Sequence, residues 1–148
     1  MKIGISNLIW MVNEAINRVI VKEATSQLTV LWLDDVREPR NYLSKKKDTG
    51  AYLRNIEFYN SLMSKYNVDF VWVKNINEFS DYIKNNGLPK FISFDFDLGK
   101  GLPKGSECAR WLYSYCIENG YNVPKYFVHS ANPRAKKLID DAMNRNNM

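Results

Sequence analysis

The stretch FISFDFDLGKG, residues 91–101, decides the fold of this 148-residue chain. It begins as an apolar run, places Asp95 and Asp97 one residue apart, and then continues into glycine. A short apolar run bounded by turn residues is typical of a strand buried in a parallel sheet. Because ligands bind at the carboxyl ends of such strands, we expect the two carboxylates to lie at a functional edge.

Three further segments are predicted as strands, and they alternate with segments of helical spacing. The four predicted strands are 28–35, 69–74, 90–95 and 124–130. Apolar spacing, closing glycines and the position of Pro133 predict helices over 52–63, 76–86, 106–119 and 133–144. The segment 36–50 holds a proline, a lysine triplet and a glycine, and it is predicted as a surface loop.

This order predicts an α/β protein in which a four-stranded parallel sheet is covered by helices on both faces, a three-layer sandwich. Residues 28–148 are expected to form one domain, because a chain of 148 residues with 45% hydrophobic content can bury a single core. Residues 1–27 are expected to be an extension. Within it, ISNLIWMVNEAINRVIVK at 5–22 has the apolar stripe of an amphipathic helix.

Composition excludes several classes of protein. No apolar run approaches the roughly 20 residues that a membrane span needs, and the N-terminus lacks a signal peptide, so we expect a cytoplasmic protein. One histidine and the lack of a cysteine near the acidic residues argue against zinc. Cys108 and Cys116 fall roughly 12 Å apart on one predicted helix, which is too far for a disulfide. The formal net charge of +5 modestly favours anionic partners.

Polar residues follow three of the four predicted strands, and all should converge on one rim of the sheet. The residues concerned are Asp34, Asp35, Asp95, Asp97, His129, Ser130 and Asn132. Carboxylates gathered this closely repel one another, so they either take up protons or hold a cation.

A hard cation with oxygen ligands fits the aspartates of the rim. Asp34, Asp35 and Asp95, with a backbone carbonyl near Asp97 and water, would suit Mg²⁺. Asp97 is counted among the predicted metal ligands. The alternative for each aspartate is a helix cap or a loop turn, because aspartate is common in both.

The remaining rim residues could handle a phosphate. His129 could act as a general acid or base or donate to a phosphate oxygen, and its alternative is a half-buried histidine bonded to a backbone carbonyl. Ser130 and Asn132 could donate to an anion, or Asn132 could cap the last helix. Arg37 and Lys100 could clamp a phosphate, although a surface lysine is usually only solvated.

Three motifs together resemble a known family. LWLDDVREP, ISFDFDLGKG with Gly105 downstream, and FVHSANP are similar to the receiver domains of response regulators, and more specifically to the cyclic-phosphate-processing receiver domains of bacteria and their phages. The resemblance covers about residues 28–145. It implies a receiver, or flavodoxin-like, sheet of strand order 2-1-3-4 without a fifth strand.

The resemblance also implies roles for single residues. Asp34 and Asp35 would bind the divalent metal, Asp95 would occupy the phosphoacceptor position, and Ser130 would contact the phosphoryl group. His129 and Asn132 belong to the motif at the fourth strand.

Three departures from the family's pattern bear on catalysis. No residue corresponds to the lysine that follows the fifth strand of ordinary receivers. Phe96 stands where family members tend to carry histidine, and Arg134 and Ala135 stand where they carry glycine.

These observations predict a Mg²⁺-binding receiver-like domain that binds a phosphate ester, a cyclic phosphate on RNA or on a nucleotide. The enzymatic version is a phosphoesterase of RNA processing with Asp95 and His129 as catalytic residues. The alternative is a non-catalytic regulatory module that binds a protein partner. The helix at 5–22 could pack within the chain in place of the absent last helix, or it could pair with a second copy of the chain or with that partner. No membrane role is expected. A phage protein would act in the host cytoplasm.

Overall fold

The computed structural model describes residues 27–44, 50–130 and 132–144. The helix predicted over 5–22 lies outside the described residues. The described chain divides into two compact units. The smaller unit contains residues 27–28 and 58–69 of the described chain. Within it, Asn67 Nδ2 donates to Gln27 Oε1 at 2.9 Å. The larger unit comprises the other described residues, and it contains every residue of the predicted site.

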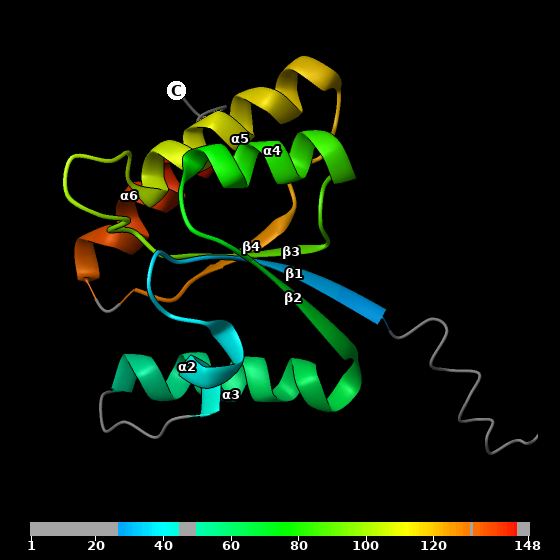
Figure 1. The fold of residues 1–148 in the computed structure, drawn as a ribbon, viewed down its shortest axis with the longest axis vertical. Coiled ribbons are helices and arrows are strands. Elements are labelled where there is room, and N and C mark those ends of the chain that lie inside the picture. Colours follow the sequence, from blue (N-terminus) through cyan, green and yellow to red (C-terminus); the bar gives the residue numbers. More distant parts are fainter. Residues whose placement is uncertain (1–26, 45–49, 131, 145–148) are drawn as a thin grey trace, which may run out of the picture. The chain divides into compact units, whose positions relative to one another are not determined.

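Four strands form one parallel sheet in the order β2-β1-β3-β4 (Figure 1). This confirms the predicted order. β1 and β3 pair with Leu33 opposite Phe94, and β3 and β4 pair with Phe94 opposite Val128. The strands are β1 (Gln27–Leu33), β2 (Asn67–Val73), β3 (Phe91–Phe94) and β4 (Lys125–Val128).

Side chains of the central strands alternate between two buried faces. Leu31 and Leu33 of β1, with Ile92 and Phe94 of β3, belong to one hydrophobic core. Ser93 lies between the last two and therefore points to the opposite face. Burial on both faces explains why these strands read as almost continuous apolar runs.

Three helices supply the other half of that core. They are α4 (Ile76–Asn86), α5 (Gly105–Asn119) and α6 (Pro133–Met143), and α4 lies beside α5 in Figure 1. Their core residues include Phe79, Ile83, Leu112 and Ile139. Gly87 and Gly120 follow the ends of α4 and α5, as predicted. No helix in the described part of the chain is long and apolar enough to cross a membrane.

One element differs from the sequence prediction. The segment predicted as a surface loop contains a short helix, α2 (Pro39–Ser44), ahead of α3 (Gly50–Lys65). The fixed φ of Pro39 suits the first helical position, and Tyr42 N donates to Glu38 O at 2.8 Å. Tyr42 and buried Leu43 give α2 an apolar side, and the Tyr42 ring lies 5.7 Å from that of Trp32. The many polar residues of segment 36–50 obscured the apolar spacing, so the sequence analysis did not predict this helix.

Both cysteines are buried in α5, and neither forms a disulfide. Burial, with the nearby charge of Glu107, raises the pKa of the Cys108 thiol to about 12. The two residues therefore serve as packing groups, as predicted.

Candidate functional site

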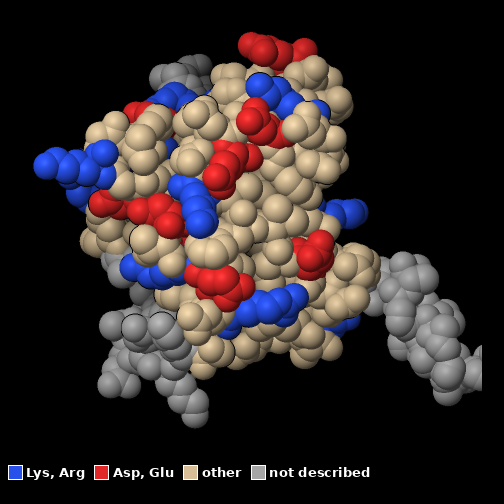
Figure 2. Space-filling model, in the orientation of Figure 1, with Lys and Arg blue, Asp and Glu red and all other residues tan. Residues whose placement is uncertain are grey.

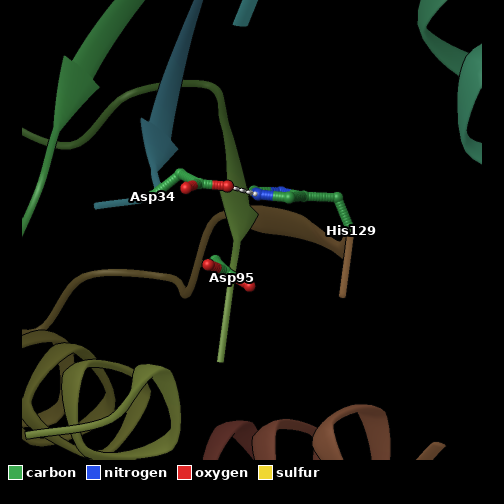
Figure 3. A group of neighbouring side chains, drawn as sticks. All are labelled: Asp34, Asp95 and His129. Carbon is green, nitrogen blue, oxygen red and sulfur yellow. Dashed lines mark hydrogen bonds and ion pairs between the residues drawn. The ribbon is translucent and has the colours of Figure 1, made fainter. Parts of the chain in front are cut away.

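The register of the sheet brings three polar residues to one edge. Asp34, Asp95 and His129 each come directly after the matched ends of β1, β3 and β4. Each extends the sheet by one hydrogen bond, in which its own backbone N–H donates to a neighbouring strand at 2.9–3.0 Å. One ligand atom from each side chain lies within 4.8 Å of the others (Figure 3). The predicted convergence of these three residues is therefore confirmed.

His129 is enclosed by this arrangement. Its Nε2 lies 2.9 Å from Asp34 Oδ2, and its Nδ1 lies 2.7 Å from Ser93 Oγ. The imidazole stacks on Trp32 with ring centroids 4.0 Å apart, and its side chain has no exposed surface. Burial lowers the pKa of His129 even though the bond to Asp34 opposes this. Neither ring nitrogen is open to solvent in this arrangement.

The carboxylate of Asp34 is held by four donors. Its Oδ1 accepts from the backbone N–H groups of Val36 at 3.0 Å and Arg37 at 2.8 Å. Its Oδ2 accepts from His129 Nε2 and, more weakly, from Arg37 Nη1 at 3.4 Å. Burial opposes ionisation, but the bonds from His129 and from the two backbone groups outweigh it and lower the pKa of Asp34. Asp34 is therefore an ionised residue.

Arg37 bridges the two buried carboxylates. Its Nη1 lies 3.4 Å from Asp34 Oδ2 and 3.7 Å from Asp95 Oδ2. The arginine side chain is 48% exposed, so it can turn away from the pocket without breaking the core. The sequence analysis expected Arg37 to bind a phosphate. In the structure its side chain lies against both acids and partly neutralises them.

Two tryptophans fix the loop that carries Asp34 and Arg37. The Trp32 indole N–H donates to the carbonyl of Arg37 at 2.9 Å, and the Trp72 indole N–H donates to the carbonyl of Asp34 at 2.7 Å. The sequence analysis did not assign site roles to these residues or to Ser93. A signal was present, because a buried indole N–H or a hydroxyl inside an apolar strand requires a partner.

Asp95 is the under-compensated charge of the site. It is 5% exposed, and its Oδ1 accepts from the N–H of Phe96 at 2.8 Å. Burial and then the charge of Asp34 raise the pKa of Asp95 to about 7, while the Phe96 N–H and Arg37 act in the opposite direction. A buried carboxyl group in this state gains most from a cation of higher charge.

Gly105, the first residue of α5, allows the backbone of Asp95 to sit where it does. Gly105 N donates to Phe96 O at 2.7 Å. A Cβ atom at this position would lie 1.9 Å from the carbonyl oxygen of Asp95. The helix can approach the strand end this closely only with glycine.

The other predicted acids occupy different positions. Asp35 is partly buried, and its charge contributes to the raised pKa of Asp95. Asp97 has a side chain 76% exposed and pairs with Lys104 at 3.7 Å. Asp97 is not part of the cluster formed by Asp34, Asp95 and His129 among the described residues. Lys100 is exposed in the same loop.

The polar residues after β4 form hydrogen bonds with the backbone at the start of α6. Asn132 caps α6, because its Oδ1 accepts from Arg134 N at 2.9 Å, which confirms the cap interpretation. The hydroxyl of Ser130 accepts from Asn132 N at 3.2 Å. Ser130 remains partly exposed, so its hydroxyl hydrogen can still serve a ligand.

The sequence of the whole described site matches one family. A model of the cyclic-phosphate processing receiver domain matches residues 29–145. The chain belongs to this family. The resemblance drawn from the three motifs is thereby confirmed for the receiver domain, and the extension before residue 29 lies outside the match.

Two solved structures are similar to this receiver domain. One is a fusion containing amino acids 181–211 of the yeast Spc42 trimeric coiled coil, at 14% identity and a TM-score of 0.46 over 79% of this chain. This chain spans 61% of the length of that fusion. The other is the N-terminal domain of a response regulator/sensory box/GGDEF 3-domain protein from Carboxydothermus hydrogenoformans, at 13% identity and a TM-score of 0.39. It matches over 80% of this chain and 96% of its own. No curated protein matches the chain.

The donor set of the site suits a hard divalent cation. Asp95 offers Oδ2, whereas the Oδ2 of Asp34 is shared with His129 and Arg37. Asp35 lies outside the cluster of Asp34, Asp95 and His129 among the described residues, although its charge acts on Asp95. His129 Nε2 already faces Asp34, so it is a weak candidate for a ligand despite its proximity. Carboxylate oxygens with room for water are the ligands that Mg²⁺ prefers.

Proposed function

We propose that this receiver domain binds Mg²⁺ and a phosphate ester at the carboxyl edge of its sheet. The observation that carries the proposal is the buried carboxyl of Asp95, which lies beside Asp34 and has one hydrogen bond, from the N–H of Phe96, and a long contact of 3.7 Å to the Arg37 cation. Such a pocket is stabilised by a cation that keeps open positions for a phosphate. The family name supports a cyclic phosphate as the ester.

Each side chain has a role that follows from its position. Asp95 and Asp35 would hold the cation, and Asp34 would add an oxygen if Arg37 turned away. Bound Mg²⁺ supplies positive charge that polarises the phosphoryl oxygens. Arg37, freed from the carboxylates, turns its guanidinium to the phosphate. Ser130 donates its hydroxyl to a phosphoryl oxygen.

The ester we propose is a terminal 2′,3′-cyclic phosphate, on a nucleotide or at an RNA end. Among the described residues of the face shown in Figure 2, acidic and basic side chains are interspersed and form no continuous basic surface. A long RNA backbone would favour such a surface. In hydrolysis, the oxygen of water bonds to phosphorus, one ring P–O bond breaks, and the proton that the water loses ends on the released ribose oxygen. In this proposal Asp95 acts on the phosphoryl group through the cation that it would hold.

Mg²⁺ is expected to raise the Tm of the full chain. At a hundredfold excess over Kd the stabilisation should be about 3 kcal/mol, because only the folded state assembles the carboxylates. Asp35→Ala and Asp95→Ala should each remove most of this shift. Differential scanning fluorimetry with and without Mg²⁺ measures it, and Asp81→Ala, an exposed acid on α4, is the matched control.

The substrate arm uses a 2′,3′-cyclic nucleotide with Mg²⁺ present. Binding should require Mg²⁺ and be lost in Asp95→Ala, and turnover should yield a nucleoside monophosphate detectable by chromatography. Binding without turnover would restrict the domain to recognition. A wild-type Tm that does not change on addition of Mg²⁺ would contradict the proposal.

Arg37→Gln is expected to move two affinities in opposite directions. Removing the guanidinium relieves the carboxylates of a competing cation, so Mg²⁺ should bind roughly two- to fivefold more tightly, as for a partly exposed ion pair. The cyclic nucleotide should bind more weakly, because it loses a charge-assisted donor. Isothermal titration calorimetry measures both, with Arg110→Gln, exposed on α5, as the control. Changes of the same sign would refute the dual role.

One observation favours a second candidate, a regulatory module that binds a protein partner without chemistry. Four donors already hold Asp34, and Arg37 bridges both acids, so the site is partly balanced without a metal. Under this alternative, neither the wild type nor Arg37→Gln responds to Mg²⁺. The metal titrations above therefore separate the two functions.

A further inference from the structure

Ser93 is the one hydroxyl in the otherwise apolar strand β3, FISF, and it is fully buried. In the register of the sheet it lies between Trp32 of β1 and Phe127 of β4. It therefore stands on the same face of the sheet as the stacked rings of Trp32 and His129.

The His129 ring runs from the end of β4 across β3 to β1. One ring nitrogen, Nδ1, lies 2.7 Å from Ser93 Oγ, and the other, Nε2, lies 2.9 Å from Asp34 Oδ2. All three side chains are buried. Three strands are thus joined by one chain of two short hydrogen bonds beneath the carboxylate edge.

The chemistry of the three groups fixes the direction of these bonds. An ionised carboxylate only accepts, so the proton between Asp34 and His129 belongs to Nε2. The imidazole has no exposed surface and is stacked on Trp32, and such burial favours its neutral form. A neutral imidazole carries one N–H, which leaves Nδ1 as an acceptor. The Ser93 hydroxyl is then the donor to Nδ1. The reverse arrangement would need a proton on Asp34 Oδ2, but this oxygen also lies 3.4 Å from Nη1 of Arg37, and a cation beside it disfavours that proton.

We propose that Ser93 is a positioning residue of this site. Its hydroxyl holds His129 in the Nε2–H tautomer, and His129 in turn fixes the orientation of the Asp34 carboxylate. The last step rests on the proposed function, in which Asp34 serves the cation. His129 accordingly acts through Asp34 and does not contact the ester.

The single histidine of the chain makes the tautomer directly measurable. Full-length protein labelled with ¹⁵N-histidine should give one protonated, pyrrole-type Nε2 and one unprotonated, pyridine-type Nδ1 by NMR at neutral pH. Ser93→Ala should shift the Nδ1 resonance and allow the other tautomer to appear. Ser93→Thr, which keeps the hydroxyl, should restore the wild-type pattern.

Metal affinity gives the second readout. Removing a partner that orients a ligand costs tenfold or more in typical sites, so Ser93→Ala should weaken Mg²⁺ binding by about tenfold while Ser93→Thr should not. Circular dichroism checks that each variant is folded.

Two results would overturn the inference. The first is a wild-type His129 with its proton on Nδ1 or on both nitrogens, which decides the matter even if a variant fails to fold. The second is a folded Ser93→Ala with unchanged histidine resonances. Absence of Mg²⁺ binding in the wild type would instead refute the proposed function, because the tautomer is read without metal.

Discussion

Asp95→Asn is expected to stabilise the metal-free protein at pH 8 and to abolish its response to Mg²⁺. The pKa of Asp95 is raised from 3.8 to about 7, mainly by burial, so its ionised form is costly in the folded state. A shift of this size corresponds to about 4 kcal/mol. The buried amide of asparagine would lack some hydrogen-bond partners, and this costs about 1–3 kcal/mol of the stability gained by removing the charge. We expect a higher Tm, by several degrees.

The pH dependence follows from the same shift. Between about pH 4 and pH 7 the folded protein binds a proton at Asp95 that the unfolded chain has released, so stability should fall as pH rises through this window. Asp34 has a lowered pKa, so its contribution is present above about pH 4 and is lost only in more acidic solution. The two groups therefore act in separate ranges.

Thermal melts in EDTA from about pH 4.5 to about pH 8.5 measure this effect, because this range spans the ordinary pKa of aspartate and the raised pKa of Asp95. The wild type should lose stability towards pH 7, and Asp95→Asn should flatten that decline. Asp81→Asn, on the surface of α4, should leave it unchanged. An Asp95→Asn protein that is less stable than the wild type at pH 8 would show that the carboxylate is better compensated than its contacts indicate.

Gly105→Ala is expected to destabilise the domain strongly. Alanine in a helix is normally more stabilising than glycine, by roughly 0.5–1 kcal/mol. Here the new Cβ would lie 1.9 Å from Asp95 O and 3.1 Å from Phe96 Cα, so helix or strand end must move. Overpacking of this kind costs about 1–3 kcal/mol, and contact with backbone should place it at the upper end.

Urea denaturation measures this loss, and Ser114→Ala, exposed on the same helix, is its matched control. The displacement should also disturb Asp95, so Mg²⁺ binding should weaken together with stability. An alanine variant as stable as the wild type would mean that α5 can shift away from the strand end at little cost.

The sheet was predictable because its signals are local. Each central strand is a short apolar run, and polar residues follow the ends of three strands, which is the pattern that a parallel sheet buried on both faces imposes. The convergence of Asp34, Asp95 and His129 followed from that pattern together with the strand order. Helix α2 was missed because its apolar side comprises few residues among many charged ones.

The partners within the site were not predictable in the same way. Nothing in the sequence indicates that Arg37 lies between two carboxylates, since this depends on the path of one loop past another strand. The burial of His129 depends on the ring of Trp32 and on Ser93, which are distant in the chain. Asp95 and Asp97 look equivalent in the sequence, but only Asp95 continues the strand into the pocket.

Because β1, β3 and β4 end in register, the face to which Asp34 and Asp95 point depends on the alternation of side chains along each strand. Deleting one residue within β3 would turn the carboxylate of Asp95 towards the core formed with α4, α5 and α6. An apolar neighbour would then take its place at the carboxyl end of the strand. Residues added after Asp97 would leave that alternation intact. Evolution can thus vary the connecting segments, and with them ligand preference, while the charged edge is inherited unchanged.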